Sequence, residues 1–190
     1  MRVWMVQPLG PTKRSLLGHL AIDVSRKMLM RARAETHDPA IRYLRADLER
    51  LRSGSFDLVF SSLALHYVKN LRGLMWKVRR SLVAGGRLVF SVEHPIYTAP
   101  SSPRWRTASG RRFWPVNGYL EEGPRSTDWL AKGVIKHHRT LAPYLNMLLR
   151  LGFSISEVNE WGPTPRQMAS QPGWADERQR PAFLLVAARR

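Results

Sequence analysis

"LAIDVSRKMLMRARAE", residues 20–35, joins a short apolar run to an acid and then to a helical pattern. Leu20 to Ile22 predict the end of a buried strand, and Asp23 stands at its tip. Ser25 occupies a helix-capping position, because its hydroxyl can accept a hydrogen bond from a free backbone N–H of the first turn. Apolar residues then recur at helical spacing, namely Met28, Leu29 and Ala32. The stretch therefore predicts a strand, a turn and a helix.

The segments that follow continue this alternation. Residues 41–45 and 56–60 are short apolar runs. Residues 71–82 repeat apolar side chains at helical spacing, and the glycine pair at 85 and 86 is predicted to stop that helix before an apolar strand at 87–92. Alternating strands and helices predict parallel pairing with right-handed crossovers, with 56–60 and 87–92 adjacent. The continuous apolar runs predict strands that are covered on both faces.

The last third of the chain predicts an edge to this sheet. A helical pattern over 141–149 is ended by Gly152, and strands are predicted at 153–158 and 180–190. Two strands that close a sheet after a helix indicate an antiparallel edge. Residues 98–128 are rich in Pro, Ser, Gly, Arg and Trp, which is typical of an insertion or lid. We therefore expect a single α/β domain over residues 20–190.

Four local sequences, in this order, resemble class I S-adenosylmethionine-dependent methyltransferases of the small-molecule type. They are "IDVSRKMLMRARA" from residue 22, "ADL" at 46–48, "FDLVFSSLALHYV" from residue 56 and "LVAGGRLVFSVEHP" from residue 82, where Ala84 replaces the family's usual Pro. The resemblance implies a Rossmann-like sheet, mainly parallel with an antiparallel C-terminal edge. It also implies methyl transfer from S-adenosylmethionine to a small-molecule acceptor.

The resemblance assigns cofactor-binding roles to residues at the strand ends. Asp23 would accept hydrogen bonds from the ribose hydroxyls, and Asp47 would bind the adenine amino group with the Leu48 backbone beside it. Ser61 and Ser62 would line the methionine end through main-chain atoms. The alternative for Asp23 is a plain turn or helix-capping role, which strand-tip acids often have.

Acceptor-binding roles fall on two further loops. His66 would face the acceptor from the loop after the fourth strand, and Glu93, His94 and Tyr97 would lie at the carboxyl end of the fifth strand, where open α/β sheets bind ligands. His66 and His94 are the candidate general bases, because histidine titrates near neutral pH. The alternative for His66 is packing under the next helix. No metal site is expected, since the adjacent pair His137 and His138 would point to opposite faces of a strand.

The first 19 residues depart from the family pattern and form an aberrant N-terminal segment. The family's first strand runs into a glycine-rich loop, whereas here Pro8 and Pro11 follow a possible short strand at residues 2–6. The first strand and helix are therefore predicted to be missing or degraded. Trp4 and Met5 have single codons, and a one-base shift reads them as Gly-Trp. Our hypothesis is a frame-shifted or truncated remnant of the glycine loop.

Composition narrows the remaining possibilities. The chain has 190 residues, no cysteine and a net charge of +17 from 31 Lys and Arg against 14 Asp and Glu. The absence of cysteine excludes disulfides and thiolate metal sites. The arginines are dispersed, so no specific nucleic-acid partner is expected, although a basic nucleic-acid-binding protein remains the third hypothesis. Without a membrane span or signal segment, a cytoplasmic protein is expected. The second hypothesis is a catalytically silent remnant that acts as a binding module.

Overall fold

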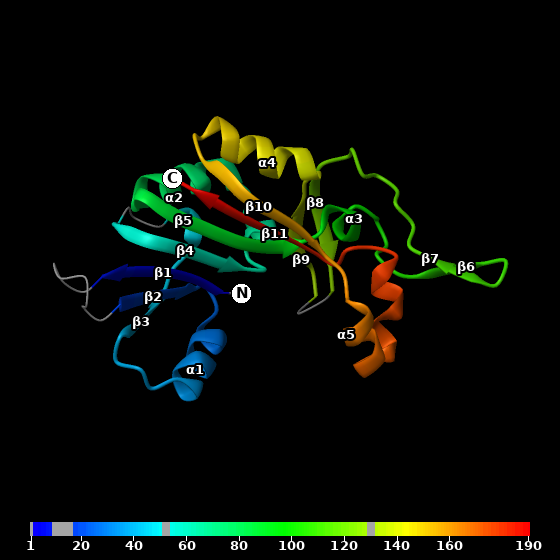
Figure 1. The fold of residues 1–190 in the computed structure, drawn as a ribbon, viewed down its shortest axis with the longest axis horizontal. Helices are drawn as coiled ribbons and strands as arrows, with labels where there is room; N and C mark the ends of the chain where they lie inside the picture. The colour runs from blue at the N-terminus through cyan, green and yellow to red at the C-terminus, as the bar shows by residue number, and fades with distance from the viewer. Residues whose placement is uncertain (1, 9–16, 51–53, 129–131) are drawn as a thin grey trace.

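The computed structural model describes residues 2–8, 17–50, 54–128 and 132–190, with residues 2–8 and 17 described by their backbone. Within these ranges, seven strands form one sheet in the order β10-β11-β5-β4-β1-β2-β3 (Figure 1). Five of these strands run in one direction, whereas β1 and β11 run in the other. Their bounds are β1 (Arg2–Pro8), β2 (Leu17–Asp23), β3 (Ile41–Arg45), β4 (Phe56–Ser62), β5 (Leu82–Glu93), β10 (Ser154–Trp161) and β11 (Phe183–Arg189).

The predicted α/β class and its antiparallel C-terminal edge are confirmed. β4 pairs in parallel with β5 at the centre, and β2 pairs in parallel with β3. β11 pairs antiparallel with both β5 and β10, as the closing pair of strands predicted. This order places the carboxyl ends of β2, β3, β4 and β5 at one end of the sheet.

In the described part of the chain, three helices of at least ten residues cover the sheet: α1 (Arg26–Glu35), α2 (Leu71–Ser81) and α4 (Leu141–Arg150). Ser25 caps α1 as predicted, because its hydroxyl accepts a hydrogen bond from the Met28 N–H at 3.3 Å. α2 and α4 share one hydrophobic core with the central strands, and α1 lies beside β3 (Figure 1). No helix in the described ranges is long and apolar enough to cross a membrane.

The glycine pair at 85 and 86 has a different role from the predicted one. α2 already ends at Ser81, and both glycines lie within β5. Gly85 has a φ of 75°, and a Cβ on Gly86 would lie 2.9 Å from the Val83 carbonyl oxygen. The pair therefore permits a close backbone approach at the start of β5, where its register against β4 shifts.

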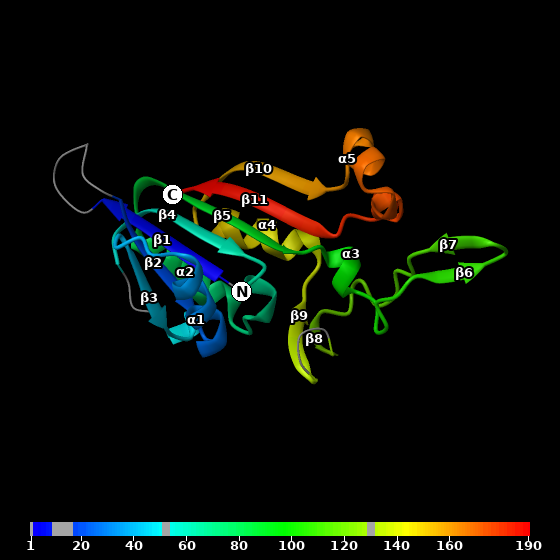
Figure 2. The same ribbon diagram turned by 90° about the horizontal axis from the view of Figure 1, so that it is seen from below.

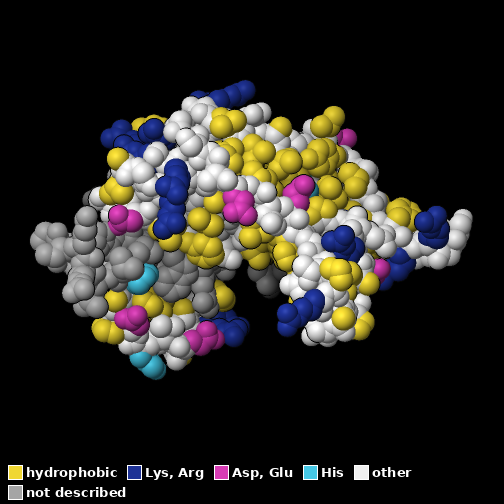
Figure 3. Space-filling model, in the orientation of Figure 1, with side chains coloured by type: hydrophobic (Ala, Val, Ile, Leu, Met, Phe, Trp, Pro, Cys, Tyr) yellow, Lys and Arg dark blue, Asp and Glu magenta, His cyan; other side chains and the backbone are white. Residues whose placement is uncertain are grey.

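The prediction that the continuous apolar runs form strands covered on both faces is wrong for β4. Phe60 of β4 is 37% exposed, between the buried Val59 and Ser61. Exposed apolar side chains also lie on β11 and β10, namely Leu185 at 38% and Val158 at 41%. Figure 3 shows hydrophobic side chains gathered on this face over β10 and β11. α2 and α4 pack on the opposite face, so the apolar sequence exceeds the cover that the described helices supply.

The insertion after β5 and the segment before β11 gather at one end of the sheet (Figure 2). Two hairpins form there, β6 (Arg106–Ala108) with β7 (Arg111–Phe113) and β8 (Gly123–Thr127) with β9 (Val134–His138). The other elements are α3 (Pro95–Thr98), α5 (Pro165–Ser170) and the short turns η1 (Leu48–Arg50), η2 (Leu65–Tyr67) and η3 (Pro172–Arg178). The sequence patterns predicted none of the four hairpin strands. That residues 98–128 act as a lid remains a prediction.

β1 fills the position of the first strand but runs in the opposite direction. It pairs antiparallel with both neighbours, so that Arg2 lies opposite Ser62 and Val3 lies opposite Ile22. Its amino end therefore lies where β2 and β4 finish, and Pro8 lies at the far end of the sheet. The predicted absence of a helix between the first two strands concerns residues 9–16, which lie outside the described residues.

Candidate active site

A cavity of about 360 Å³ opens at the carboxyl ends of β4 and β5. Glu93 is the last residue of β5 and lies opposite Phe183 of β11, and both line the cavity. Tyr97 joins them from α3. Glu93 and Tyr97, the two predicted acceptor-binding residues, are thus brought together at one cavity. Their role in binding an acceptor remains a prediction.

Leu63 lines the same cavity in a strained backbone conformation. It follows β4 and has a φ of 50°, in the left-handed region that residues other than glycine rarely adopt. The strain is held by the Leu63 N–H, which donates to the Ser91 carbonyl oxygen at 3.0 Å. Such strain costs on the order of 1–3 kcal/mol and clusters at functional sites.

Glu93 forms a buried ion pair with a lysine that the sequence analysis did not single out. Lys136 Nζ lies 2.6 Å from Glu93 Oε1, and the two side chains are 5% and 12% exposed. Glu93 Oε2 is buried and has no hydrogen-bond partner among the described residues. Burial, followed by the charge of Glu93, raises the pKa of the neighbouring Tyr97 hydroxyl. The cavity therefore holds a carboxylate with one oxygen engaged and the other available.

Aromatic rings and a second ion pair form the rest of the cavity wall. Trp161, Trp174 and Phe183 line it, with the Trp161 ring centroid 5.9 Å from that of Trp174 and 6.1 Å from that of Phe183. Arg180 also lines it and donates from Nη2 to Glu177 Oε1 at 3.0 Å. The sequence analysis predicted none of these five residues.

His66, one of the two candidate bases, lies in η2 and is 1% exposed. Its Nδ1 accepts a hydrogen bond from the Glu93 backbone N–H at 3.3 Å. The pKa of His66 is lowered to about 3, chiefly because burial disfavours the charged ring, with further effects of Lys136 and Arg139. Because the His66 ring is neutral and its Nδ1 already accepts a hydrogen bond, His66 is better suited to positioning Glu93 than to transferring a proton.

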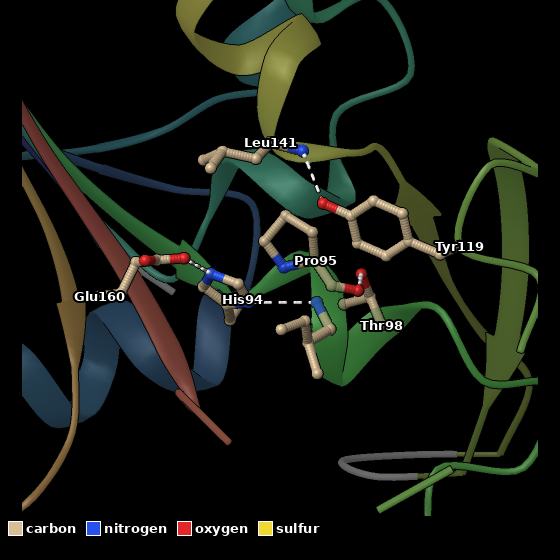
Figure 4. A network of polar contacts seen from close by, with 7 residues as sticks. His94, Pro95, Thr98, Tyr119, Leu141 and Glu160 are labelled. Atoms are coloured by element: carbon tan, nitrogen blue, oxygen red, sulfur yellow. Dashed lines mark hydrogen bonds and ion pairs between the residues drawn. The ribbon is translucent and has the colours of Figure 1, made fainter. Parts of the chain in front are cut away.

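His94, the other candidate base, uses both ring nitrogens (Figure 4). Its Nδ1 accepts from the Ile96 N–H at 3.1 Å and caps α3, while Nε2 lies 2.7 Å from Glu160 Oε1 of β10. The ring is 1% exposed, and burial lowers its pKa against the opposing effect of Glu160. His94 thus joins α3 to β10 and is not among the residues that line the cavity.

The predicted adenosine-binding residues lie at the ends of β2 and β3. Asp23 is 3% exposed, and its Oδ1 accepts from the Ser25 N–H at 2.7 Å, so it also has the turn-forming role named as the alternative. Asp47 accepts from the Glu49 N–H at 2.9 Å, and Leu48 is buried beside it. Acids at two neighbouring strand ends fit the ribose and adenine of the predicted cofactor.

The part of the cofactor site predicted to bind the methionine is less complete than the part predicted to bind the adenosine. Ser61 and Ser62 end β4, and Ser61 Oγ is buried without a hydrogen-bond partner in the described ranges. Beside them lies the amino end of β1, because Arg2 pairs with Ser62. The connection from β1 to β2 leaves from Pro8 at the other end of the sheet. The residues present therefore fit the adenosine half of the cofactor better than the methionine half.

Comparison with known proteins places this geometry in a family. A crystal structure of an S-adenosylmethionine-dependent methyltransferase from Mesorhizobium loti is 55% identical, with a TM-score of 0.84, and the match covers 90% of this chain and 79% of that one. The chain belongs to the S-adenosylmethionine-dependent methyltransferases. The family described as "Methyltransferase domain" also matches residues 7–90, beginning before residue 20, where the resemblance was recognised from the sequence. The predictions of the family and its cofactor are confirmed.

Two curated relatives of this methyltransferase are longer than the chain. A Haemophilus influenzae protein is 33% identical over 150 residues, which are 75% of this chain and 57% of that protein. A malonyl-[acyl-carrier protein] O-methyltransferase from Enterobacter lignolyticus is 37% identical over 114 residues, which are 59% of this chain and 40% of that enzyme. The chain thus spans about half the length of these relatives.

Proposed function

We propose that this chain transfers a methyl group from S-adenosylmethionine to a small-molecule acceptor held in the 360 Å³ cavity. The observation that carries the proposal is the cavity at the carboxyl ends of β4 and β5, where the strained Leu63 and the strand-end Glu93 meet. Ligands of open α/β sheets bind at this end of the strands. A relative that methylates an acyl-carrier-protein-bound malonyl group supports an acceptor other than a nucleic acid.

Asp23, Asp47 and the Leu48 backbone are proposed to hold the ribose and the adenine. Ser61 and Ser62 would line the methionine end through their main chain. When bound, the cofactor supplies an electrophilic methyl group on a sulfonium, and the protein's task is to position the acceptor and exclude water.

Glu93 is the proposed proton acceptor in place of His66 and His94. Its Oε2 is without a partner in the described part of the chain, whereas Lys136 holds its Oε1 and His66 holds its backbone N–H. An acceptor O–H or N–H that reaches Oε2 can pass its proton to this carboxylate. General base catalysis contributes roughly 10²–10⁴-fold to a rate.

The test is transfer of isotopically labelled methyl from S-adenosylmethionine to a panel of small hydroxyl and amine acceptors. With an acceptor that is labelled, Glu93→Gln is expected to lower kcat by about 10²-fold or more. Glu157→Gln, on the exposed side of β10, is the matched control and should leave the rate unchanged. Equal rates for both variants would refute the role of Glu93. Absence of transfer to every acceptor would refute the proposed activity.

A catalytically silent binding module is the second candidate function. The direction of β1 favours it, since the connection to β2 lies away from the methionine end. The exposed apolar side chains on β4, β10 and β11 also favour it, because such a face is typical of interaction surfaces. A folded chain that binds neither S-adenosylmethionine nor its product would support this alternative.

A further inference from the structure

Arg180 is a buried cation with unused hydrogen-bond donors. Its side chain is 6% exposed, and Nη2 donates to Glu177 Oε1. Nε and Nη1 are buried and have no hydrogen-bond partner within the residues that the structure describes. Buried donors are nearly always satisfied, and each exception calls for a missing partner. The two nitrogens of Arg180 therefore require acceptor atoms from elsewhere.

The rings around the guanidinium supply no such acceptors, and Glu177 Oε2 forms no hydrogen bond among the described residues although Oε1 binds Arg180. The guanidinium Cζ lies 4.1, 4.6 and 5.3 Å from the ring centroids of Trp114, Tyr97 and Trp105, respectively. These rings stabilise the positive charge by cation–π contact but offer no oxygen lone pairs. Trp105 and Trp114 come from the insertion, which thereby fixes the guanidinium beside the cavity. Acceptor atoms can reach Arg180 from the cavity that it lines.

The charged residues around the cavity indicate which charged group a ligand of Arg180 carries. Glu93 is paired with Lys136, and Glu177 occupies one guanidinium nitrogen, so the two acids do not satisfy Arg180. A single carboxylate offers about four acceptor positions and forms charge-assisted hydrogen bonds with arginine. Glu93 Oε2 is available to an O–H or N–H elsewhere on the same ligand.

The shape of the ligand follows from the walls. Trp161, Trp174 and Phe183 present flat apolar surfaces, which favour a planar body. We propose that the acceptor is a planar aromatic carboxylate, that Arg180 binds its carboxylate, and that its hydroxyl or amine faces Glu93. This substrate class rests on the proposed function, but recognition by Arg180 is measurable without the cofactor.

The experiment compares 2-naphthoate with 2-naphthamide, which has the same ring system and no charge, in ligand-observed NMR titrations of the full chain. Loss of a charge-assisted hydrogen bond corresponds to roughly tenfold or more in affinity, so naphthoate is expected to bind at least about tenfold more tightly than the amide. Arg180→Gln should abolish this preference. The control Arg178→Gln, at an exposed position two residues away, should retain it.

Equal affinities of the two ligands for the unaltered chain would overturn the proposal, as would a retained preference in folded Arg180→Gln. If thermal melting shows that Arg180→Gln does not fold, Arg180→Lys replaces it. This variant is expected to bind naphthoate several-fold more weakly. An unchanged naphthoate affinity would overturn the role of Arg180. Naphthoate selectivity in a chain that fails to bind S-adenosylhomocysteine would refute the methyltransferase proposal and leave the carboxylate site standing.

Discussion

The pKa of His66 provides a direct test of whether this residue is a base or a positioning group. Its value falls from 6.5 to about 3, mainly through burial, so the native ring stays neutral at pH values where an unfolded chain binds a proton. The unfolded state therefore binds more protons between these pH values. The stability that neutral His66 contributes is fully present above pH 6.5 and is lost as pH falls toward 3.

The magnitude follows from the change in pKa. One pH unit corresponds to 1.36 kcal/mol, so the fall from 6.5 to about 3 amounts to about 5 kcal/mol in total. Between pH 6.5 and pH 5, about 2 kcal/mol of stability should be lost through this residue. His66→Asn keeps an acceptor for the Glu93 N–H but removes the titrating group, so the variant should lack this part of the pH dependence.

Urea unfolding at pH 7, 6 and 5 measures the effect in both chains. His37→Asn, at an exposed position, is the control that should retain the wild-type slope. In parallel, the ring resonances of His66 should not titrate between pH 5 and pH 8. A His66 ring that titrates near pH 6.5, or equal slopes for the unaltered chain and His66→Asn, would refute the positioning role.

Three further predictions concern stability and partners. Lys136→Met leaves a buried carboxylate unpaired and should lower the free energy of unfolding by about 3–5 kcal/mol. The double variant with Glu93→Gln should recover more than half of that loss. A loss under about 1 kcal/mol in urea unfolding would contradict the buried pair. Ser25→Ala should cost about 1 kcal/mol through loss of the α1 cap, and an unchanged thermal midpoint would argue against it. Binding to duplex DNA should be weak, unselective and lost between 50 and about 200 mM salt, and tight sequence-selective binding would contradict this.

Local sequence patterns predicted the helices and strands that depend on interactions between residues close in the sequence. The capping hydroxyl of Ser25 and the apolar spacing after it identify α1, and the bounds of β3 match the predicted run of residues 41–45. The same alternation, together with the family resemblance, placed Glu93 and Tyr97 at the carboxyl end of β5, where both line the cavity; their role in binding an acceptor stays a prediction.

The remaining features depend on contacts between distant segments. The direction of β1 is set by its pairing with β2 and β4, and a short apolar run carries no mark of strand direction. Arg180 is buried because Trp105 and Trp114 pack on it from the insertion, more than 60 residues away in the chain. The burial of Lys136 has a local cause that the sequence only weakly indicates. Lys136 alternates with Ile135 and His137 along β9, so it lies on the same face of the strand as the buried His138.

Calorimetric titration with S-adenosylhomocysteine and with adenosine tests the central claim most directly. If Asp23 and Asp47 hold the adenosine half and the reversed β1 leaves the methionine half without its loop, both ligands should bind with similar, roughly millimolar affinity. Two lost hydrogen bonds to charged groups correspond to about 2–4 powers of ten. Asp23→Asn should weaken both ligands, and the exposed control Asp57→Asn should weaken neither. Micromolar binding of S-adenosylhomocysteine that exceeds adenosine binding by about 100-fold, or binding that is indifferent to Asp23, would contradict this account.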